Sequence, residues 1–292
     1  TRCGILVVNA PTSNTIAVAE HTLALILALA RNIVPANASA HAGEWRRSRF
    51  MGCELRGRTL GLVGLGRVGS AVAVRARALE MRLLAHDPLV STERAAQLDV
   101  RLVDLEELLC TSDVVSLHAP ATERTRGMIG ARELGLMRPE AYLINCARGD
   151  LVDTEALAAA LAAGRLAGAG LDVFPAEPHV PESLRGLPNV LLTPHLGAST
   201  QEAQERVAVE MLGRERVVDN IPISMGGEDF AFYTRHMPGV FWRLGVAPSD
   251  GSPGVESLHN GCFDFNDEAI ETGVRVHCGI VWSWASKDSA AG

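Results

Sequence analysis

The stretch Leu60-Gly-Leu-Val-Gly64-Leu-Gly66-Arg-Val-Gly69 places the spacing G-x-G-x-x-G between a short apolar run and a predicted helix. In that context each glycine has its own task. The first permits a tight turn, the second lets a phosphate approach the backbone, and the third lets the helix pack closely on the strand. The amino end of the helix then faces the anion. The stretch therefore predicts a turn that binds a dinucleotide.

A carboxylate follows at the end of the next predicted strand, in Ala85-His-Asp-Pro88. Asp87 can accept hydrogen bonds from the ribose hydroxyls of adenosine, and it would repel a 2′-phosphate. The sequence therefore predicts NAD as the cofactor, in preference to NADP. A glycine turn without any ligand is the alternative interpretation.

Short apolar runs alternate with helical patterns between residues 59 and 193, as in consecutive βαβ units. The predicted strands are residues 60–63, 82–86, 114–117, 142–145, 170–173 and 190–192. The predicted helices are residues 15–32, 69–80, 105–110, 131–137 and 154–163. This order predicts an α/β protein with a Rossmann-type, doubly wound parallel sheet.

The first predicted helix is apolar almost all round, which suggests burial on more than one side, such as against a second subunit. Its predicted apolar face consists of Ala17, Leu23, Ile26, Leu27 and Ala30. We expect a homodimer formed through the dinucleotide-binding domain.

Composition narrows the choice of partners and compartment. The 292 residues carry a net charge of −7, which leaves no basic surface suited to nucleic acid. The longest apolar run is too short to span a membrane, so we expect no membrane partner. The six cysteines are scattered and fit reduced thiols, which indicates a cytoplasmic protein.

The rhythm of strands and helices stops near Leu212, and aromatic residues become more frequent beyond it. We therefore predict a dinucleotide-binding domain over residues 1–212 and a smaller, incomplete α+β segment over residues 213–292.

Four further segments resemble those of a known enzyme family. They are Val8-Asn-Ala-Pro-Thr-Ser-Asn14 with Ala19-Glu-His21, His118-Ala-Pro-Ala-Thr122, Asn145-Cys-Ala-Arg148-Gly-Asp150, and Asp172-Val-Phe-Pro-Ala-Glu177 followed by Thr193-Pro-His195. Together they resemble the D-isomer-specific 2-hydroxyacid dehydrogenases, and in particular the phosphoglycerate dehydrogenase branch, over residues 1–212.

The resemblance implies three catalytic residues. Arg148 would hold the substrate carboxylate, His195 would exchange the hydroxyl proton, and Glu177 would pair with His195. The chemistry agrees, because a guanidinium matches a carboxylate in shape and charge, and an imidazole can act as acid or base near neutral pH. The implied substrate is a small D-2-hydroxy acid, with 3-phosphoglycerate as one candidate.

The resemblance also implies a set of cofactor contacts, in which Asp172 would bind the nicotinamide carboxamide. The set is Gly64, Gly66, Arg67, Val68, Gly69, Asp87, Cys146, Ala147, Asp172 and Gly197. Cys146 has a second interpretation as a reactive thiol.

Residues 213–292 resemble the carboxyl-terminal end of zinc-dependent amidohydrolases of the aminoacylase and carboxypeptidase type. The segments that carry this resemblance are Ser224-Met-Gly-Gly-Glu-Asp-Phe-Ala-Phe-Tyr233, Pro238-Gly-Val-Phe-Trp-Arg-Leu-Gly245 and Ser257-Leu-His-Asn-Gly-Cys-Phe-Asp-Phe-Asn-Asp267. His259 corresponds to a metal ligand there, but the other ligands have no counterpart. A hydrolytic zinc site needs about three protein ligands, so we expect no metal site.

The family's amino-terminal substrate domain also has no counterpart in this sequence, which is expected to weaken substrate binding. Three hypotheses follow: a truncated NAD-dependent oxidoreductase, a non-catalytic NAD-binding module that dimerises, and a fragment of a metal-dependent amidohydrolase.

Overall fold

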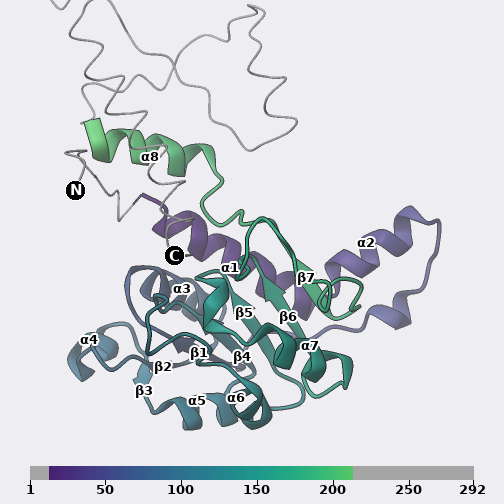
Figure 1. Cartoon of the computed structure of the whole chain (residues 1–292), viewed down its shortest axis with the longest axis horizontal. Coiled ribbons are helices and arrows are strands. Elements are labelled where there is room, and N and C mark those ends of the chain that lie inside the picture. The colour runs from purple at the N-terminus through teal and green to yellow at the C-terminus, as the bar shows by residue number, and fades with distance from the viewer. Residues whose placement is uncertain (1–12, 213–292) are drawn as a thin grey trace, which may run out of the picture. The chain divides into compact units, whose positions relative to one another are not determined.

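The computed structural model describes residues 13–212, and within this range residues 13–204 gather into one compact unit (Figure 1). Seven strands form one sheet in the order β3-β2-β1-β4-β5-β6-β7, and every pairing is parallel. The strands are β1 (Thr59–Val63), β2 (Arg82–His86), β3 (Arg101–Leu102), β4 (Val114–Leu117), β5 (Tyr142–Asn145), β6 (Gly168–Leu171) and β7 (Val190–Leu192). This order confirms the predicted doubly wound sheet.

Three strands differ from the sequence prediction. β1 begins at Thr59, one residue before its predicted start. β6 begins at Gly168 and ends at Leu171, whereas the apolar pattern predicted residues 170–173. Gly168 is crowded, because a Cβ there would lie 2.6 Å from the carbonyl oxygen of Asn189. The crowding leaves no room for a side chain at this position, so glycine is required there. Glycine has a low strand propensity, so the sequence pattern did not predict a strand at this residue. β3 was not predicted, since it is only two residues long.

The helices confirm the predicted βαβ rhythm and add shorter elements that were not predicted. They are α1 (Thr15–Ala30), α2 (Ile33–His41), α3 (Arg67–Ala78), α4 (Thr92–Gln97), α5 (Leu105–Thr111), α6 (Ala131–Leu136), α7 (Thr154–Ala162) and α8 (Gln201–Leu212). The helix predicted over residues 15–32 ends at Ala30. Asn32 has a left-handed φ of 52° there and separates α1 from α2.

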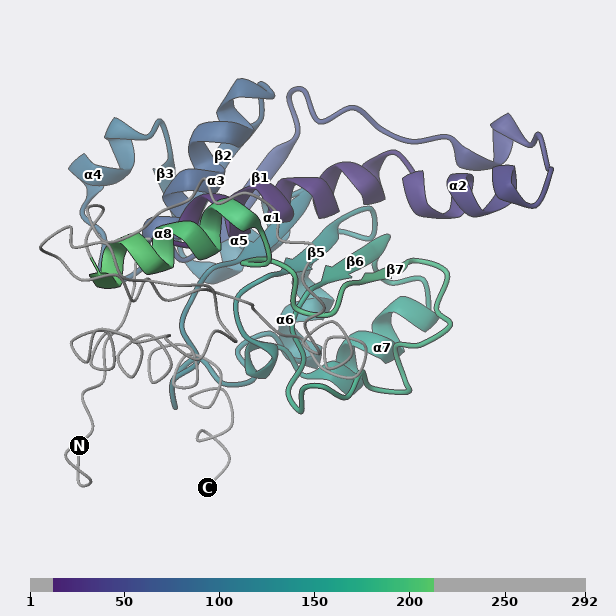
Figure 2. The ribbon, with the colours of Figure 1, turned by 90° about the horizontal axis from the view of Figure 1, so that it is seen from above.

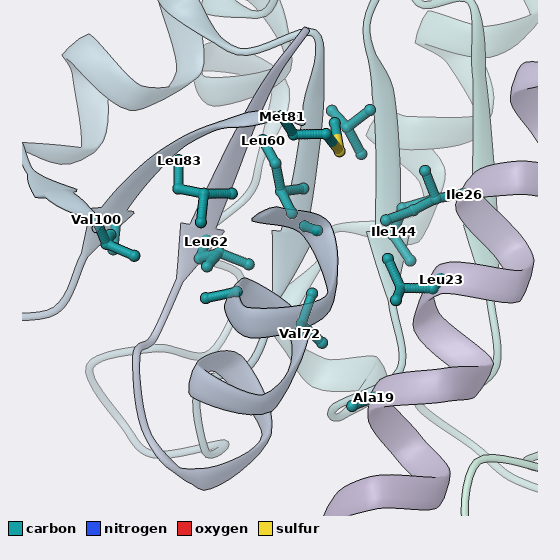
Figure 3. Close-up of a cluster of buried hydrophobic side chains, with 14 of the residues drawn as sticks. Ala19, Leu23, Ile26, Leu60, Leu62, Val72, Met81, Leu83, Val100 and Ile144 are labelled. Atoms are coloured by element: carbon teal, nitrogen blue, oxygen red, sulfur yellow. The ribbon is translucent and has the colours of Figure 1, made fainter. Parts of the chain in front are cut away.

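Two apolar clusters form the core, one on each face of the sheet. Helices α1 and α3 cover one face, and α5, α6 and α7 cover the other. Figure 3 shows Ala19, Leu23 and Ile26 of α1 on the side where Ile144 of β5 lies. Because both faces are covered, every residue of β1 and β4 is buried.

The predicted apolar face of α1 is wrong at one position. Leu27 is 38% exposed, whereas Val18, Ala19, Thr22 and Leu25 are buried along with the other predicted residues. The buried surface of α1 therefore spans more of the helix than one narrow stripe, because the helix contacts both α3 and the strands β5 and β6.

Within residues 13–212, no single helix is long and apolar enough to cross a membrane. Only α1 and α2 taken together reach that criterion, and a bend of 64° lies between them.

A buried carboxylate holds the amino edge of the sheet together. Asp113 precedes β4, and its Oδ2 accepts a hydrogen bond of 2.8 Å from the backbone N–H of Thr59 in β1. Its Oδ1 lies 3.2 Å from the Arg58 guanidinium and 3.1 Å from that of Arg138. One side chain thus joins the starts of two neighbouring strands and the segment that leads into β5.

We expect Asp113→Ala to lower the free energy of unfolding by about 2–3 kcal/mol, because it leaves the buried Thr59 N–H without an acceptor. Urea denaturation followed by far-UV circular dichroism measures the change. Glu182→Ala is the matched control: it removes an exposed ion pair with Arg185 and should cost less than about 0.5 kcal/mol. Equal losses of unfolding free energy in the two variants would contradict the stabilising role of Asp113.

Candidate functional site

The glycine turn lies between β1 and α3, and its geometry explains separately why glycine stands at each of its three positions. Gly64 has φ of 98°, and a Cβ there would lie 2.8 Å from the carbonyl oxygen of His118. A Cβ on Gly69 would collide with the carbonyl oxygen of Gly64, so α3 can pack on the turn only without a side chain there. A Cβ on Gly66 would meet nothing within 4 Å. Packing within the protein therefore does not require glycine at position 66. This fits a ligand that approaches the backbone there.

The carboxylate of Asp87 lies directly beside this turn. Its Oδ2 accepts a hydrogen bond of 2.8 Å from the backbone N–H of Leu65, and its Oδ1 accepts one of 2.9 Å from Leu89. No side chain caps the start of α3 at Gly66. Uncapped backbone N–H groups next to a fixed carboxylate fit the pyrophosphate and the ribose of a dinucleotide. The described residues therefore fit NAD at this turn.

Arg67 and Val68 begin α3 directly after the turn. Arg67 is exposed, while Val68 is half-buried and packs against the core. Their predicted contacts with the cofactor stay predictions.

His118 follows β4 and lies beneath the glycine turn. Its Nε2 is 2.9 Å from Oγ of Ser116, whereas its Nδ1 is enclosed and has no hydrogen-bond partner. Burial lowers the pKa of His118 to about 4, so the ring is neutral near pH 7. His118 therefore adds no positive charge beneath the turn.

His195 and Glu177 form a close pair after β7 and β6. His195 Nδ1 lies 2.7 Å from Glu177 Oε2, and the backbone N–H of Phe174 donates to Glu177 Oε1 at 3.1 Å. The side chains are 26% and 29% exposed, respectively. A carboxylate fixed at Nδ1 leaves Nε2 as the nitrogen that can accept a proton from outside. This pairing has the geometry that the resemblance implied.

Arg148 lies on the loop after β5. The side chain of Asn145 forms two hydrogen bonds with the backbone of that loop. Its Nδ2 donates to the carbonyl of Arg148 at 2.8 Å, and its Oδ1 accepts from the N–H of Ala147 at 3.0 Å. A Cβ on Gly149 would collide with the backbone of Phe174, so the two loops touch directly. The loop that carries Arg148 is therefore pressed against the loop that carries Glu177.

The Arg148 guanidinium is exposed, and its Nη1 donates to the carbonyl of Ala147 at 2.6 Å. Within the part of the chain that the structure describes, it forms no salt bridge with any carboxylate. An unpaired guanidinium at this place can accept the carboxylate of a ligand.

Asp172 follows β6, and its side chain is only 1% exposed. Burial raises the pKa of its carboxyl, but hydrogen bonds from His21, Thr193 and the backbone N–H groups of Leu196 and Gly197 outweigh this effect, so the pKa lies below its ordinary value. The carboxylate is therefore ionised and holds the loop that follows His195. Its predicted contact with the nicotinamide carboxamide stays a prediction.

Gly197 and Cys146 pack around α1 and Asp172. A Cβ on Gly197 would lie 3.1 Å from Asp172 Oδ2 and 3.4 Å from Val18. Cys146 is buried, and burial raises the pKa of its thiol to about 12. A thiol that stays protonated near neutral pH is a poor nucleophile, so this favours the interpretation of Cys146 as a small lining residue.

Sequence reasoning missed three polar residues that position the site, namely Asn145, Thr193 and His21. A signal existed for His21, since a histidine inside an almost continuously apolar helix needs a polar partner. The partner itself, Asp172, is 151 residues away and could not be identified from the sequence.

No group of three His, Cys, Asp or Glu side chains within residues 13–212 is arranged to bind a metal ion. His259 lies outside the described residues. Two surface hollows, of about 450 and 690 Å³, lie between α5 and α6 and at the amino edge of the sheet, away from all predicted site residues.

Comparison with known families identifies the domain that carries this site. The family model described as "D-isomer specific 2-hydroxyacid dehydrogenase, NAD binding domain" matches residues 23–197, more than half of the chain. The chain belongs to this dehydrogenase family. The match includes the glycine turn, Asp87, Arg148, Glu177 and His195.

Relatives within the dehydrogenase family support the same placement. The chain is 50% identical over 218 residues to D-3-phosphoglycerate dehydrogenase of Synechocystis, covering 75% of this chain and 39% of that protein. It is 51% identical over 210 residues to the Archaeoglobus fulgidus enzyme, covering 72% and 40%. The crystal structure of D-lactate dehydrogenase from Aquifex aeolicus, complexed with NAD and lactic acid, matches with a TM-score of 0.65 and 36% identity, covering 70% of this chain and 67% of that one.

The chain spans about two fifths of the length of these curated relatives. A second family model, "Peptidase family M20/M25/M40", matches residues 192–283. Most of that match lies outside the described residues, so the predicted boundary at Leu212 stays a prediction.

Proposed function

We propose that this chain binds NAD at the glycine turn and carries the catalytic residues of a D-2-hydroxy acid dehydrogenase. The observation that supports this most is the His195 and Glu177 pair, 2.7 Å apart, on loops at the same edge of the sheet as the glycine turn. The substrate class is a small D-2-hydroxy acid, and the phosphoglycerate dehydrogenase relatives favour 3-phosphoglycerate.

Each proposed catalytic residue has one task. Bound NAD supplies the hydride acceptor for the carbon that carries the hydroxyl group. Arg148 binds the substrate carboxylate, which orients that carbon. His195 accepts the hydroxyl proton on Nε2 as the alcohol becomes a ketone, and Glu177 stabilises the resulting imidazolium through Nδ1. In the reverse direction His195 returns the proton to the oxygen.

Gly66→Ala should weaken NADH binding at least tenfold without lowering the thermal unfolding midpoint. The added methyl group meets no protein atom within 4 Å, so it intrudes only on a ligand at the turn. Isothermal titration calorimetry with NADH measures the affinity. Gly130→Ala is the matched control, because Gly130 also precedes a helix with an extended backbone, at α6. Equal NADH affinity of Gly66→Ala and wild type would place the cofactor elsewhere.

His195→Ala should abolish NAD-dependent oxidation of D-2-hydroxy acids, and Glu177→Gln should slow it by about 10²–10⁴-fold. The rates follow from NADH absorbance with 3-phosphoglycerate and D-lactate as substrates. NADH affinity in both variants should stay within about threefold of wild type, since neither change alters the glycine turn. A His195→Ala variant that keeps the wild-type rate would remove His195 from the mechanism.

A non-catalytic NAD-binding module is the second candidate. The observation that favours it is the glycine turn with Asp87, whose geometry fits a dinucleotide without any contribution from Arg148, Glu177 or His195. Tight NADH binding without turnover of any D-2-hydroxy acid by the wild-type chain would select this candidate. The amidohydrolase hypothesis has support only from the match to residues 192–283, and we make no proposal from it.

We also propose that the chain forms a homodimer through α1 and α2. No residue of α2 is buried, and Ile33 and Val34 are 51% and 54% exposed. Figure 2 shows α2 continuing beyond the end of α1, away from the strands. Exposed apolar side chains on a projecting helix are typical of a surface that a partner covers.

The scattered cysteines, of which Cys53, Cys110 and Cys146 are free thiols, support a cytoplasmic location.

Ile33→Glu should convert the dimer to a monomer at micromolar concentration, because it places a charge in the proposed interface. Sedimentation velocity measures the mass. Leu89→Glu, at a leucine that is 93% exposed and lies on a different part of the unit, should leave the dimer intact. A wild-type chain that sediments as a monomer would contradict the proposal.

A further inference from the structure

A second imidazole, that of His21 in α1, contacts the loop that carries His195. His21 Nε2 lies 3.2 Å from Asp172 Oδ1 and 3.1 Å from Thr193 Oγ1. Both partners belong to the segments that enter this loop, Asp172 after β6 and Thr193 after β7. α1 is therefore linked by hydrogen bonds to a loop far from it in sequence.

Asp172 also accepts hydrogen bonds from the backbone beside His195. Its Oδ1 accepts hydrogen bonds from Thr193 Oγ1 at 2.6 Å and from the N–H of Leu196 at 2.7 Å. Its Oδ2 accepts from the N–H of Gly197 at 2.8 Å. The two peptide groups that follow His195 are thus held by one carboxylate.

The backbone of His195 needs such support. Its φ is 54°, in the left-handed region that costs a residue with a side chain of this size roughly 1 kcal/mol or more. Such a conformation persists only where neighbouring contacts determine it. The hydrogen bonds from Leu196 and Gly197 to Asp172 supply those contacts, and they fix the direction in which the ring meets Glu177.

A buried carboxylate keeps its position only if hydrogen-bond donors occupy its acceptor sites. His21 contributes one of the hydrogen bonds to Asp172, with a distance of 3.2 Å from Nε2 to Oδ1. Its own side chain is 19% exposed, so it closes the outer side of the carboxylate. Loss of its N–H would leave Asp172 Oδ1 with two donors and open that side.

We propose that His21 is a positioning residue for His195: it anchors Asp172, which holds His195 in the left-handed conformation that directs Nδ1 to Glu177. This inference rests on the proposed role of His195. It assigns no contact with substrate or cofactor to His21.

The test is the tautomer of the His195 ring, which nitrogen-15 NMR of the histidine-labelled full chain reports without substrate or cofactor. A carboxylate at Nδ1 selects the Nδ1–H tautomer. In His21→Leu, we expect the ratio of Nδ1–H to Nε2–H tautomer at His195 to fall about tenfold, the effect of one lost charge-assisted hydrogen bond. His21→Gln keeps a donor near the position of Nε2 and should restore the ratio.

Two further variants complete the comparison. His21→Asn carries a donor that is too short to reach Asp172, and it should behave like His21→Leu if the leucine variant does not fold. Glu20→Gln, the neighbouring change on α1, removes only an ion pair with Arg75 and should leave the ratio unchanged. A wild-type ratio in both His21→Leu and His21→Asn would overturn the proposal, and so would an equal fall in Glu20→Gln.

Failure of this inference is distinct from failure of the proposed function. A wild-type chain that shows the Nδ1–H tautomer but neither binds NADH nor oxidises a hydroxy acid would contradict only the proposed function. A chain that turns over substrate with an unchanged tautomer ratio in the His21 variants would contradict only the role of His21.

Discussion

All seven strands of the sheet run in the same direction, and this constraint determines where the polar chemistry of the chain can gather. Parallel strands end at one edge, so the loops that follow them meet there even when they are far apart in sequence. The glycine turn follows β1, Asp87 follows β2, Arg148 follows β5, and His195 follows β7. The opposite edge holds the Asp113 ion pairs, which join strand starts and contribute to stability.

Buried polar groups make this edge rigid. Asn145 fixes the loop of Arg148, and Asp172 fixes the loop of His195, each through hydrogen bonds to backbone groups. A carboxylate or amide buried without partners would cost several kcal/mol, so each of these loops has essentially one arrangement that satisfies its anchor. The Arg148 guanidinium at the same edge is exposed and forms no salt bridge within the described residues, so its charge is free to meet a ligand.

The sequence predicted those features that depend on local patterns. The glycine turn, the parallel sheet and the bounds of β2, β4, β5 and β7 follow from apolar runs and their spacing. The start of β6 at Gly168 did not, because crowding by Asn189 rather than strand propensity selects glycine there. Leu27 was misplaced because, in a helix that is apolar almost all round, the sequence does not indicate which side stays uncovered.

The candidate site divides in the same way. The resemblance to the dehydrogenases named Arg148, Glu177 and His195, and the structure adds the contacts among their loops. The link from His21 through Asp172 to His195 joins residues more than 150 positions apart, and no local pattern encodes it.

We propose that the glycine turn and the His195 and Glu177 pair serve one bound dinucleotide. A two-dimensional NMR titration of the full chain with NADH tests this most directly, by following the backbone amide of Gly66 and the imidazole of His195 together. If one dinucleotide reaches both places, both resonances shift and saturate at the same NADH concentration. A shift at Gly66 with none at His195, or a shift at neither, would contradict it.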